Sequence, residues 1–392
     1  MLRPRTLIFH PALAPYRVDL FNRLRQALDM RVVFLSDHVA YYRELNQDSL
    51  RNSLKCQHDY LLRGFRFRER DFRIGMGRII HGWAPEVVVS HEFSYATLYI
   101  MFYRKCLAKR AFGHVLWTAE SIHMLGSRRG LQKAIRLLCS RAVDSLLVYS
   151  QQIKDGFVTL GVPPEKIFIC ANHQDKESFW KKLEAASPLA EECIRKHNLE
   201  GKKVVLFVGR LAAVKNLDCL LEAFAQVSQK VSQALLTLVG TGPEKKNLEV
   251  LASHLGIADR VLFIGHREGP QVHIWYLLGA LLVLPSTWEP YGAVVNEALL
   301  SGSPVICSSR AGASVLVREG KNGGVFDPHD RKTLARLMER ILVDAPGLGA
   351  TGKFRQESLM PVSFSRDVTS FVQAVEYAAS ASGRKGKYSL KK

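Results

Sequence analysis

Short runs of apolar and β-branched residues alternate with helix-length segments through the first half of the chain. Runs of this length and composition are typical of buried strands. Strands that alternate with helices form a parallel sheet that is covered by helices on both faces. The pattern predicts such strands at residues 6–9, 31–36, 86–90, 114–117 and 145–150.

The second half of the chain restarts the same alternation. Two separate sheets fit this restart better than one continuous sheet. We therefore predict an α/β protein of two Rossmann-like, doubly wound domains. In the second domain, a helix at 217–229 is expected among strands at 203–209, 234–240, 260–265, 281–285 and 304–308.

The boundary between the predicted domains is placed in the charged segment 181–201, which is interpreted as turn-rich because it holds Pro188 and Gly201. After the second domain, apolar residues recur mostly at helical spacing, and the chain then ends in a basic segment that we expect to be disordered. The predicted parts are an N-terminal domain at 1–185, a C-terminal domain at 186–363, a helix at 364–382 and a basic tail at 383–392.

The composition of the 392-residue chain, with 47% hydrophobic and 23% charged residues, is typical of a globular protein. Its longest apolar stretch, 277–285, is shorter than the roughly 18 residues that a membrane-spanning helix needs. Residues 1–10 pass directly into a strand and lack a signal-peptide pattern. The seven cysteines contain no Cys-x-x-Cys pair, so we expect reduced thiols, a cytoplasmic location and no structural metal.

The formal net charge is +19, and most of this excess lies in the first half of the chain. Such a surface suits an anionic partner: nucleic acid, anionic lipid headgroups or a phosphorylated glycan. The segments 103–110 and 128–141 interleave cations with apolar residues, and Arg129, Lys133 and Arg136 fall toward one helical face. This pattern predicts peripheral attachment to the inner face of the cytoplasmic membrane, although a solvated helix face gives the same pattern.

Loops that follow parallel strands are the places where such sheets bind ligands. The first of these loops in the second domain carries Gly209, Arg210 and Lys215. Two cations beside the free N–H groups of a helix start suit a diphosphate. A glycine turn with two solvated cations is the alternative interpretation of this loop.

The second loop holds Gly240 and Gly242, which either allow the backbone to approach a ligand or simply turn the chain. The third loop carries Glu289, and Glu297 lies about one turn into the helix that follows. A carboxylate can accept two hydroxyl hydrogens at once, so Glu297 suits a ribose diol. The alternatives are a capping role for Glu289 and a solvated position for Glu297. Donor contacts are also expected from residues at the start of this helix, namely Tyr291, Gly292, Ala293 and Val294.

These motifs follow one another in a fixed order: Gly209-Arg210-Leu211 with Lys215-Asn216, Gly240-x-Gly242-Pro243, Pro285-Ser286 with Glu289 and Glu297, and Gly302-x-Pro304-Val305-Ile306. Together they resemble the family 4 glycosyltransferases of GT-B fold, of the type that builds bacterial cell-surface glycans. The resemblance implies two Rossmann-like domains that face a central cleft, retention of the anomeric configuration and no required metal. It also implies that Arg210 and Lys215 neutralise the donor diphosphate, that Glu289 contacts the transferred sugar and that Glu297 holds the ribose.

The acceptor-side catalytic residue is expected in the first domain, at Glu120 or His91, because both follow predicted strands. Polar residues that cap helices are the alternative explanation for this pair. Many family members carry a histidine near the position of Ala119 or Glu120, and this chain does not. Relatives also often have adjacent glycines in the first loop, where Arg17 is expected to supply charge instead.

We therefore predict a retaining glycosyltransferase of hexosyltransferase type, acting in polysaccharide or lipopolysaccharide biosynthesis. It would move a sugar from a UDP- or GDP-sugar to a glycan or lipid-linked acceptor, with no cofactor besides this co-substrate. A GT-B epimerase is an alternative, but the loop sequences are more similar to the transferases. A nucleic-acid-binding protein without transferase activity is the alternative from another class, although charge does not explain the carboxylates of the third loop and no nucleic acid is expected. The aromatic residues that motivate it lie among arginines, namely Tyr41, Tyr42, Phe65, Phe67 and Phe72.

Overall fold

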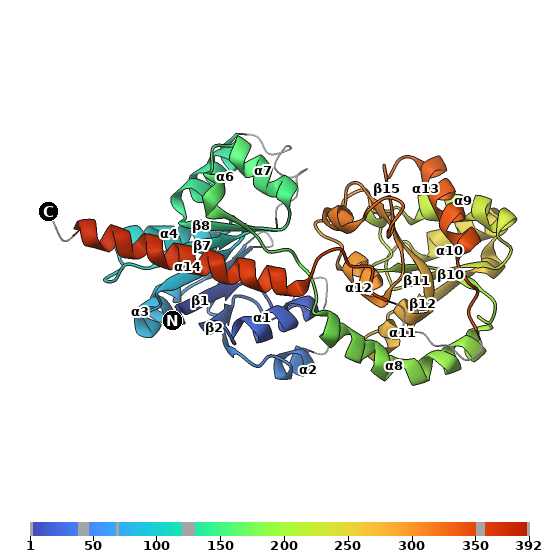
Figure 1. Cartoon of the computed structure of the whole chain (residues 1–392), viewed down its shortest axis with the longest axis horizontal. Coiled ribbons are helices and arrows are strands. Elements are labelled where there is room, and N and C mark those ends of the chain that lie inside the picture. The colour runs from blue at the N-terminus through green and yellow to red at the C-terminus, as the bar shows by residue number, and fades with distance from the viewer. Residues whose placement is uncertain (1–2, 38–46, 68–69, 120–129, 350–356, 390–392) are drawn as a thin grey trace. The chain divides into compact units, whose positions relative to one another are not determined.

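The computed structural model describes residues 3–37, 47–67, 70–119, 130–349 and 357–389. The chain forms two compact units (Figure 1). The N-terminal unit consists of Met1–His173 together with Phe364–Lys392, and the C-terminal unit is Gln174–Ser363. Each unit is described by itself below.

The N-terminal unit is built on a parallel sheet in the order β3-β2-β1-β6-β7-β8-β9. Its central strands are buried along most of their length because helices cover both faces of the sheet. The carboxyl ends of all these strands meet at one edge. The strands are β1 (Arg5–His10), β2 (Asp29–Phe34), β3 (Gln57–Tyr60), β6 (Val87–His91), β7 (Gly113–Trp117), β8 (Ser145–Val148) and β9 (Ile167–Ile169).

The last helix of the chain, α14 (Phe364–Ser389), packs in the N-terminal unit against β7, β8 and β9 (Figure 1). Phe371 of this helix is fully buried, and its ring centroid lies 5.3 Å from that of Trp117. The helix comes so close to β7 that a Cβ at Gly113 would lie 2.4 Å from the carbonyl oxygen of Ala378. The other helical segments of this unit are η1 (Pro15–Arg17), α1 (Val18–Leu24), α2 (Gln47–Asn52), α3 (Met76–Trp83), α4 (Tyr95–Cys106), α6 (Leu131–Ala142), α7 (Gln151–Thr159) and η3 (Pro164–Lys166).

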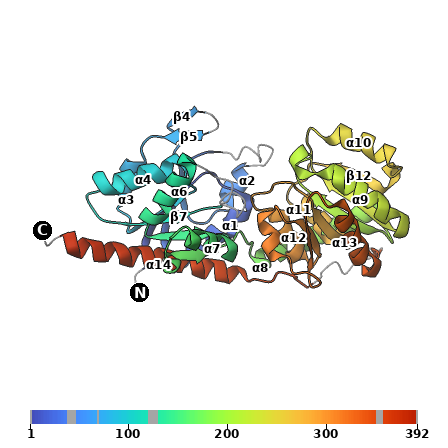
Figure 2. The same cartoon turned by 90° about the horizontal axis from the view of Figure 1, so that it is seen from above.

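A separate antiparallel hairpin is formed by β4 (Gly64–Phe67) and β5 (Arg70–Arg73). The hairpin lies beside α4 (Figure 2), and the rings of Phe72 and Tyr95 join the two with a centroid separation of 5.0 Å. Phe65 stacks on Phe72 and is exposed.

The C-terminal unit is built on a second parallel sheet in the order β12-β11-β10-β13-β14-β15. Its strands are β10 (Lys203–Val208), β11 (Ala234–Val239), β12 (Val261–Gly265), β13 (Gly279–Leu284), β14 (Val305–Ser308) and β15 (Gly323–Phe326). The sheet is covered by the helical segments α8 (Lys176–His197), η4 (Ala213–Lys215), α9 (Leu217–Lys230), α10 (Lys245–His254), η5 (Ala258–Arg260), α11 (Pro270–Leu278), α12 (Ala293–Ser301), η6 (Gly312–Leu316) and α13 (Arg331–Asp344).

The predicted α/β architecture with two parallel sheets is confirmed, and each predicted strand overlaps an observed one. The segment 181–201 differs in part from its prediction, because α8 continues through Pro188 to His197, and only residues 198–201 form the expected turns. Ala186, Ala190 and Ile194 are buried, so tertiary packing of the apolar face outweighs the local effect of the proline. Helix α14 likewise continues to Ser389, where a disordered tail was expected.

The cysteines agree with the predicted reduced thiols, since all seven are free. Four are buried: Cys56, Cys139, Cys170 and Cys307. Burial raises the pKa of Cys56 and Cys139 to about 11, so both thiols stay protonated at neutral pH and pack as small apolar groups.

Candidate functional site

The loops after β10 and β11 pack backbone against backbone, which explains the two glycines of the second loop. The amide of Leu211 donates a hydrogen bond to the carbonyl of Thr241 over 2.9 Å. A Cβ at Gly240 would lie 1.9 Å from the carbonyl oxygen of Gly209, and a Cβ at Gly242 would lie 2.1 Å from that of Leu211. Gly240 also has a φ of 144°, which side chains rarely adopt. This close approach accounts for both glycines without a ligand, and their predicted donor contact stays a prediction.

The loop after β10 is joined to the loop after β13 by an ion pair between Lys215 and Glu289. The side chains are only 19% and 14% exposed, respectively. Asn216 lies in the left-handed region at a φ of 55°, and its side-chain amide donates to the carbonyls of Pro285 and Pro328 over 3.2 and 2.8 Å. The structure therefore brings together two predicted site residues that are far apart in the sequence.

The backbone of Glu289 is held by the loop that follows β14. Its amide donates to the carbonyl of Arg310 over 3.3 Å, and its carbonyl accepts from the amide of Gly312 over 3.1 Å. A Cβ at Gly312 would lie 2.3 Å from the carbonyl oxygen of Pro290, so this approach requires glycine. The carboxylate of Glu289 is thus anchored through its main chain as well as through Lys215.

Helix α12 begins beside this carboxylate. Gly292 precedes the helix with a φ of 93°, and a Cβ there would lie 2.6 Å from Cδ2 of Leu284. The first amides of a helix, here those of Ala293 and Val294, have no intrahelical acceptor and point out of its N-terminus. Such a terminus, next to a cation such as Lys215, suits the oxygens of a phosphate. The predicted helix start after Glu289 is confirmed.

The carboxylate of Glu297 accepts two hydrogen bonds, from the hydroxyl of Tyr276 over 2.5 Å and from the side-chain amide of Gln174 over 2.7 Å. It is therefore not the solvated helix residue of the alternative interpretation. Burial raises the pKa of Glu297, and these two hydrogen bonds oppose that effect. A carboxylate has about four acceptor sites, so it retains acceptor capacity for further hydroxyl groups. The contacts of Tyr276 and Gln174 with Glu297 were not predicted, because the sequence around Tyr276 resembles an ordinary core segment and that around Gln174 an ordinary loop.

Two further predicted donor residues lie at opposite extremes of exposure. Arg210 is exposed and forms no side-chain hydrogen bond or ion pair within the described part of the chain. Tyr291 is only 7% exposed, and its neighbour Gly292 is also buried. Arg210 is consequently a cation available to a ligand, whereas the donor contact of Tyr291 stays a prediction.

The acceptor-side residues of the prediction lie at the end of β6 and after β7. Glu120 lies outside the described residues. His91 is largely buried, and burial lowers its pKa well below the usual range, assisted by His10 and Arg17. His91 is therefore neutral at physiological pH. Glu92 has a φ of 59°, and its carboxylate accepts from the hydroxyl of Thr118 and the amide of Ala119 over 3.0 and 2.7 Å.

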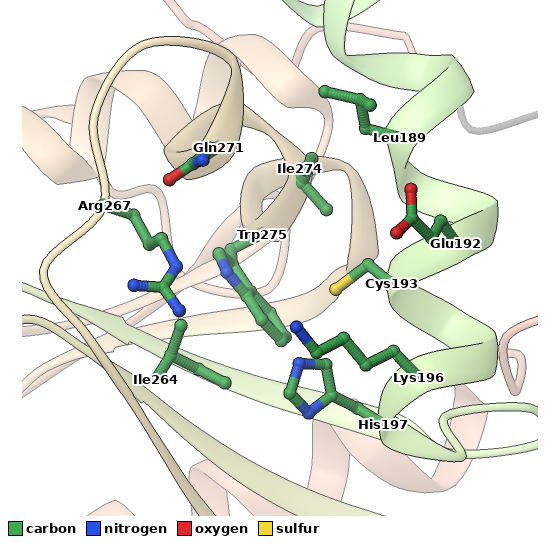
Figure 3. A pocket seen from close by; sticks show the side chains of 10 residues that line it. All are labelled: Leu189, Glu192, Cys193, Lys196, His197, Ile264, Arg267, Gln271, Ile274 and Trp275. Atoms are coloured by element: carbon green, nitrogen blue, oxygen red, sulfur yellow. The ribbon is translucent and has the colours of Figure 1, made fainter.

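A separate hollow of about 420 Å³ lies between α8, α11 and the end of β12 in the C-terminal unit (Figure 3). The indole of Trp275 lies in the middle of the side chains that line it (Figure 3). The ring centroids of Trp275 and His197 are 5.8 Å apart. Burial and the charges of Lys196 and Arg267 lower the pKa of His197. None of the predicted donor residues lines this hollow, whose lining is Leu189, Glu192, Cys193, Lys196, His197, Ile264, Arg267, Gln271, Ile274 and Trp275.

Among the described residues, no group of three or more His, Cys, Asp and Glu side chains is arranged to hold a metal ion. In the same part of the chain, no helix combines the length and the apolar character that crossing a membrane requires.

Residues 190–355 match the family described as glycosyl transferases group 1. This range includes every residue predicted to bind the donor. Among curated proteins, the chain is similar to alpha-D-kanosaminyltransferase of Streptomyces kanamyceticus, with 31% identity over 153 residues, or 39% of this chain and 40% of that protein. It is also similar to the lipopolysaccharide core biosynthesis glycosyltransferase LpsE of Rhizobium meliloti, with 33% identity over 141 residues, or 36% of this chain and 40% of that protein. The matches thus span less than half the length of these relatives.

Solved structures resemble the chain over nearly its whole length. Anabaena HepE in complex with UDP has a TM-score of 0.67 at 16% identity, covering 98% of this chain and 99% of that one. The lipopolysaccharide outer core galactosyltransferase WaaB in its apo form has a TM-score of 0.62 at 16% identity, covering 95% and 99%. At such low identity the likeness establishes the fold alone, and the predicted GT-B fold is confirmed.

Proposed function

The C-terminal unit belongs to the group 1 glycosyl transferases, and from this premise we propose that the protein is a retaining, metal-independent glycosyltransferase. Its donor is a UDP- or GDP-sugar, and its acceptor is a glycan or a lipid-linked glycan. The observation that carries the proposal is the preformed ion pair of Lys215 and Glu289, which lies beside the N-terminus of α12. The same helix carries Glu297, whose carboxylate is held by a hydrogen bond from Tyr276.

In this proposal each part of the donor meets a group of matching chemistry. Lys215, Arg210 and the first amides of α12 bind the diphosphate, since cations and helix N-termini favour phosphate oxygens. Glu297 accepts hydrogen bonds from the ribose hydroxyls, and Glu289 accepts them from the transferred sugar. A uridine donor is supported by Anabaena HepE, whose structure was solved in complex with UDP-glucose.

The reaction breaks the bond between the anomeric carbon and the diphosphate oxygen and forms a bond from that carbon to the acceptor oxygen, on the same face of the sugar. Negative charge grows on the diphosphate as its bond breaks. Cations and amides already in position, such as Lys215 and the start of α12, stabilise this charge without reorganising. The proton of the acceptor hydroxyl passes to an oxygen of the leaving diphosphate, so no protein base is obligatory.

On the acceptor side, we assign His91 a role as a neutral hydrogen-bonding group rather than as an acid. An imidazole whose pKa lies well below the usual range does not carry a proton to donate at neutral pH. Glu120 remains the proposed alternative acceptor-side residue.

We further propose that the N-terminal unit attaches to an anionic membrane surface, which suits a lipid-linked acceptor. Large apolar side chains are exposed on the hairpin and its neighbouring segments, including Phe65, Phe67, Ile74 and Phe102, each at least 55% exposed. Exposed arginines such as Arg66 lie among them. Apolar groups that enter the headgroup region together with cations that face anionic lipids favour peripheral binding. The similarity to a lipopolysaccharide core transferase supports an acceptor of this kind.

The donor site is tested by the shift in unfolding temperature with UDP, GDP, ADP and CMP, because a ligand that binds only the native state stabilises it. We expect one nucleoside diphosphate to raise the unfolding temperature, and the shift to be reduced in Lys215→Ala and Glu297→Ala. Glu249→Gln, on the exposed surface of the same unit, serves as a matched control that keeps the shift. The absence of any nucleotide response, together with a response to short oligonucleotides, would overturn the proposal.

A further inference from the structure

Aromatic and histidine side chains converge where the central strands of the N-terminal sheet end. His10 closes β1, His91 closes β6, Trp117 closes β7 and Tyr149 directly follows β8. The ring centroids of His10 and His91 are 4.6 Å apart, and those of His91 and Trp117 are 5.3 Å apart. Because these strands are parallel neighbours, residues remote in sequence form one cluster at the sheet edge.

Arg17 lies within this cluster and is only 2% exposed. One of its terminal nitrogens, Nη2, donates to the hydroxyl of Tyr149. Its guanidinium carbon lies 4.0 Å from the centroid of the Trp117 ring, in a cation–π arrangement. Its other two nitrogens, Nε and Nη1, have no hydrogen-bond acceptor among the described residues. A buried, permanently charged guanidinium is thus left with two of its nitrogens unsatisfied.

No carboxylate in the described part of the chain forms an ion pair with Arg17. The nearby carboxylate of Glu92 is engaged by Thr118 and Ala119. The carboxylate of Asp367 is engaged by His173 and by the amide of Ala171. A cation–π contact compensates only part of the cost of burying such a charge, so the native fold retains Arg17 at an unfavourable position.

The neighbours of Arg17 add further donors. The indole nitrogen of Trp117 is fully buried and has no acceptor among the described residues. Neither ring nitrogen of His91 has a hydrogen-bond partner there, since Oε1 of Glu92 lies 3.8 Å from Nδ1, and one of the two nitrogens carries a proton in the neutral ring. His10 donates through Nδ1 to the carbonyl of Ala12 over 2.9 Å, so its other nitrogen is a lone-pair acceptor. The cluster therefore has more N–H donors than acceptors, together with one uncompensated positive charge.

We propose that Arg17, with Trp117 and His91, binds an oxyanion at this sheet edge, and that the oxyanion is a phosphate or carboxylate group of the sugar acceptor. A tetrahedral or planar oxyanion supplies both the negative charge and several acceptor lone pairs, which the guanidinium recognises through its fork of N–H groups. Because Arg17 is 2% exposed, an oxyanion bound to its guanidinium is shielded from bulk water. The assignment to the acceptor rests on the proposed function, whereas the oxyanion site itself does not.

The experiment measures binding of methyl phosphate and of acetate by unfolding temperature and by calorimetry, with sodium chloride holding the ionic strength constant. Wild type is compared with Arg17→Gln, with Trp117→Phe and with Arg78→Gln. Arg78 lies exposed on α3 of the same unit, so its variant removes one positive charge away from the cluster. Each titration is repeated with saturating UDP.

We expect at least one oxyanion to raise the unfolding temperature of wild type and Arg78→Gln. Arg17→Gln should bind it about tenfold or more weakly, and Trp117→Phe, which keeps an aromatic ring but loses the donor, roughly fivefold more weakly. Trp117→Phe keeps the test valid if Arg17→Gln does not fold. A wild-type response no larger than that to chloride, or an unchanged response in both variants, would overturn the site.

Competition with UDP separates the two possible sources of the oxyanion. Simultaneous binding of UDP and methyl phosphate supports the acceptor assignment. Displacement of methyl phosphate by UDP would instead assign the oxyanion to the donor and would overturn the acceptor assignment. A protein that responds to methyl phosphate but to no nucleotide retains the oxyanion site while contradicting the proposed transferase function.

Discussion

The ammonium group of Lys215 is paired with the carboxylate of Glu289, which joins the loop after β10 to the loop after β13. Both side chains are mostly buried, so neither charge is well solvated without the other. The two groups that we assign to the donor diphosphate and the transferred sugar are thus held in position before a donor arrives. Such preorganisation lowers the cost of binding and of stabilising the leaving group.

The first prediction concerns the stability that this pair contributes. Lys215→Met and Glu289→Gln should each lower the free energy of unfolding by about 1–3 kcal/mol, because each leaves a mostly buried partner uncompensated. The double variant should lose less than the sum of the two single variants. Urea unfolding at neutral pH measures all three differences.

The matched control for this cycle is the exposed pair of Lys230 and Glu339, in which the lysine is 64% exposed. Lys230→Met should change the free energy of unfolding by about 0–1 kcal/mol, since water screens such pairs. Additive effects of Lys215→Met and Glu289→Gln would show that the two charges do not depend on each other.

The second prediction follows from the raised pKa of Glu297. The native state holds the Glu297 proton more tightly than the unfolded state, so native stability falls as the pH rises and Glu297 ionises. Glu297→Gln cannot ionise. The stability of this variant relative to wild type should therefore increase between about pH 4 and pH 7. Its affinity for a nucleoside diphosphate should be lower than that of wild type. Urea midpoints at both pH values, with Glu249→Gln as an exposed control, measure the change.

A relative stability of Glu297→Gln that falls over this pH range would mean that the hydrogen bonds from Tyr276 and Gln174 outweigh burial. Tyr276→Phe separates these contributions, because it removes one donor without changing the burial of the carboxylate. It should raise the pKa of Glu297 further and weaken nucleotide binding.

The third prediction tests why glycine occupies position 240. Gly240→Ala places a Cβ against the carbonyl oxygen of Gly209 and should lower the free energy of unfolding by about 3 kcal/mol or more. Gly256 has a φ of 67° but open space around it, so Gly256→Ala should cost only about 1 kcal/mol of backbone strain. Equal losses in the two variants would show that strain alone matters and that the two loops can separate.

The parallel sheets and the positions of the loops that follow their strands were predictable from the sequence because their signals are local. Buried strands of a parallel sheet appear as continuous apolar runs, and the loops that follow them carry the polar residues. The helical conformation of 181–197 was not predictable in this way. Its proline and charges indicate turns, and only packing against α11 and α12 makes α8 the favourable conformation.

The cluster around Arg17 shows a second limit of sequence-based prediction. Arg17 itself was expected to supply charge, but Trp117 and Tyr149 appear in the sequence as ordinary residues near strand ends. Their importance depends on which strands are neighbours, and the order β1-β6-β7-β8 is a property of the fold. Unsatisfied donors such as Nε of Arg17 become visible only when every neighbouring acceptor has been placed.

The last prediction concerns membrane attachment of the N-terminal unit. The double variant Phe65→Ser and Phe67→Ser should bind vesicles of anionic phospholipid at least roughly fivefold more weakly than wild type, because it removes two exposed apolar anchors. Val343→Ser is the matched control, since Val343 is 60% exposed on the C-terminal unit. Co-sedimentation at low salt measures binding, and added salt should weaken it because screening reduces attraction to the arginines. Wild-type protein that fails to bind at low salt, or hairpin variants that bind like Val343→Ser, would show that this apolar surface serves another purpose.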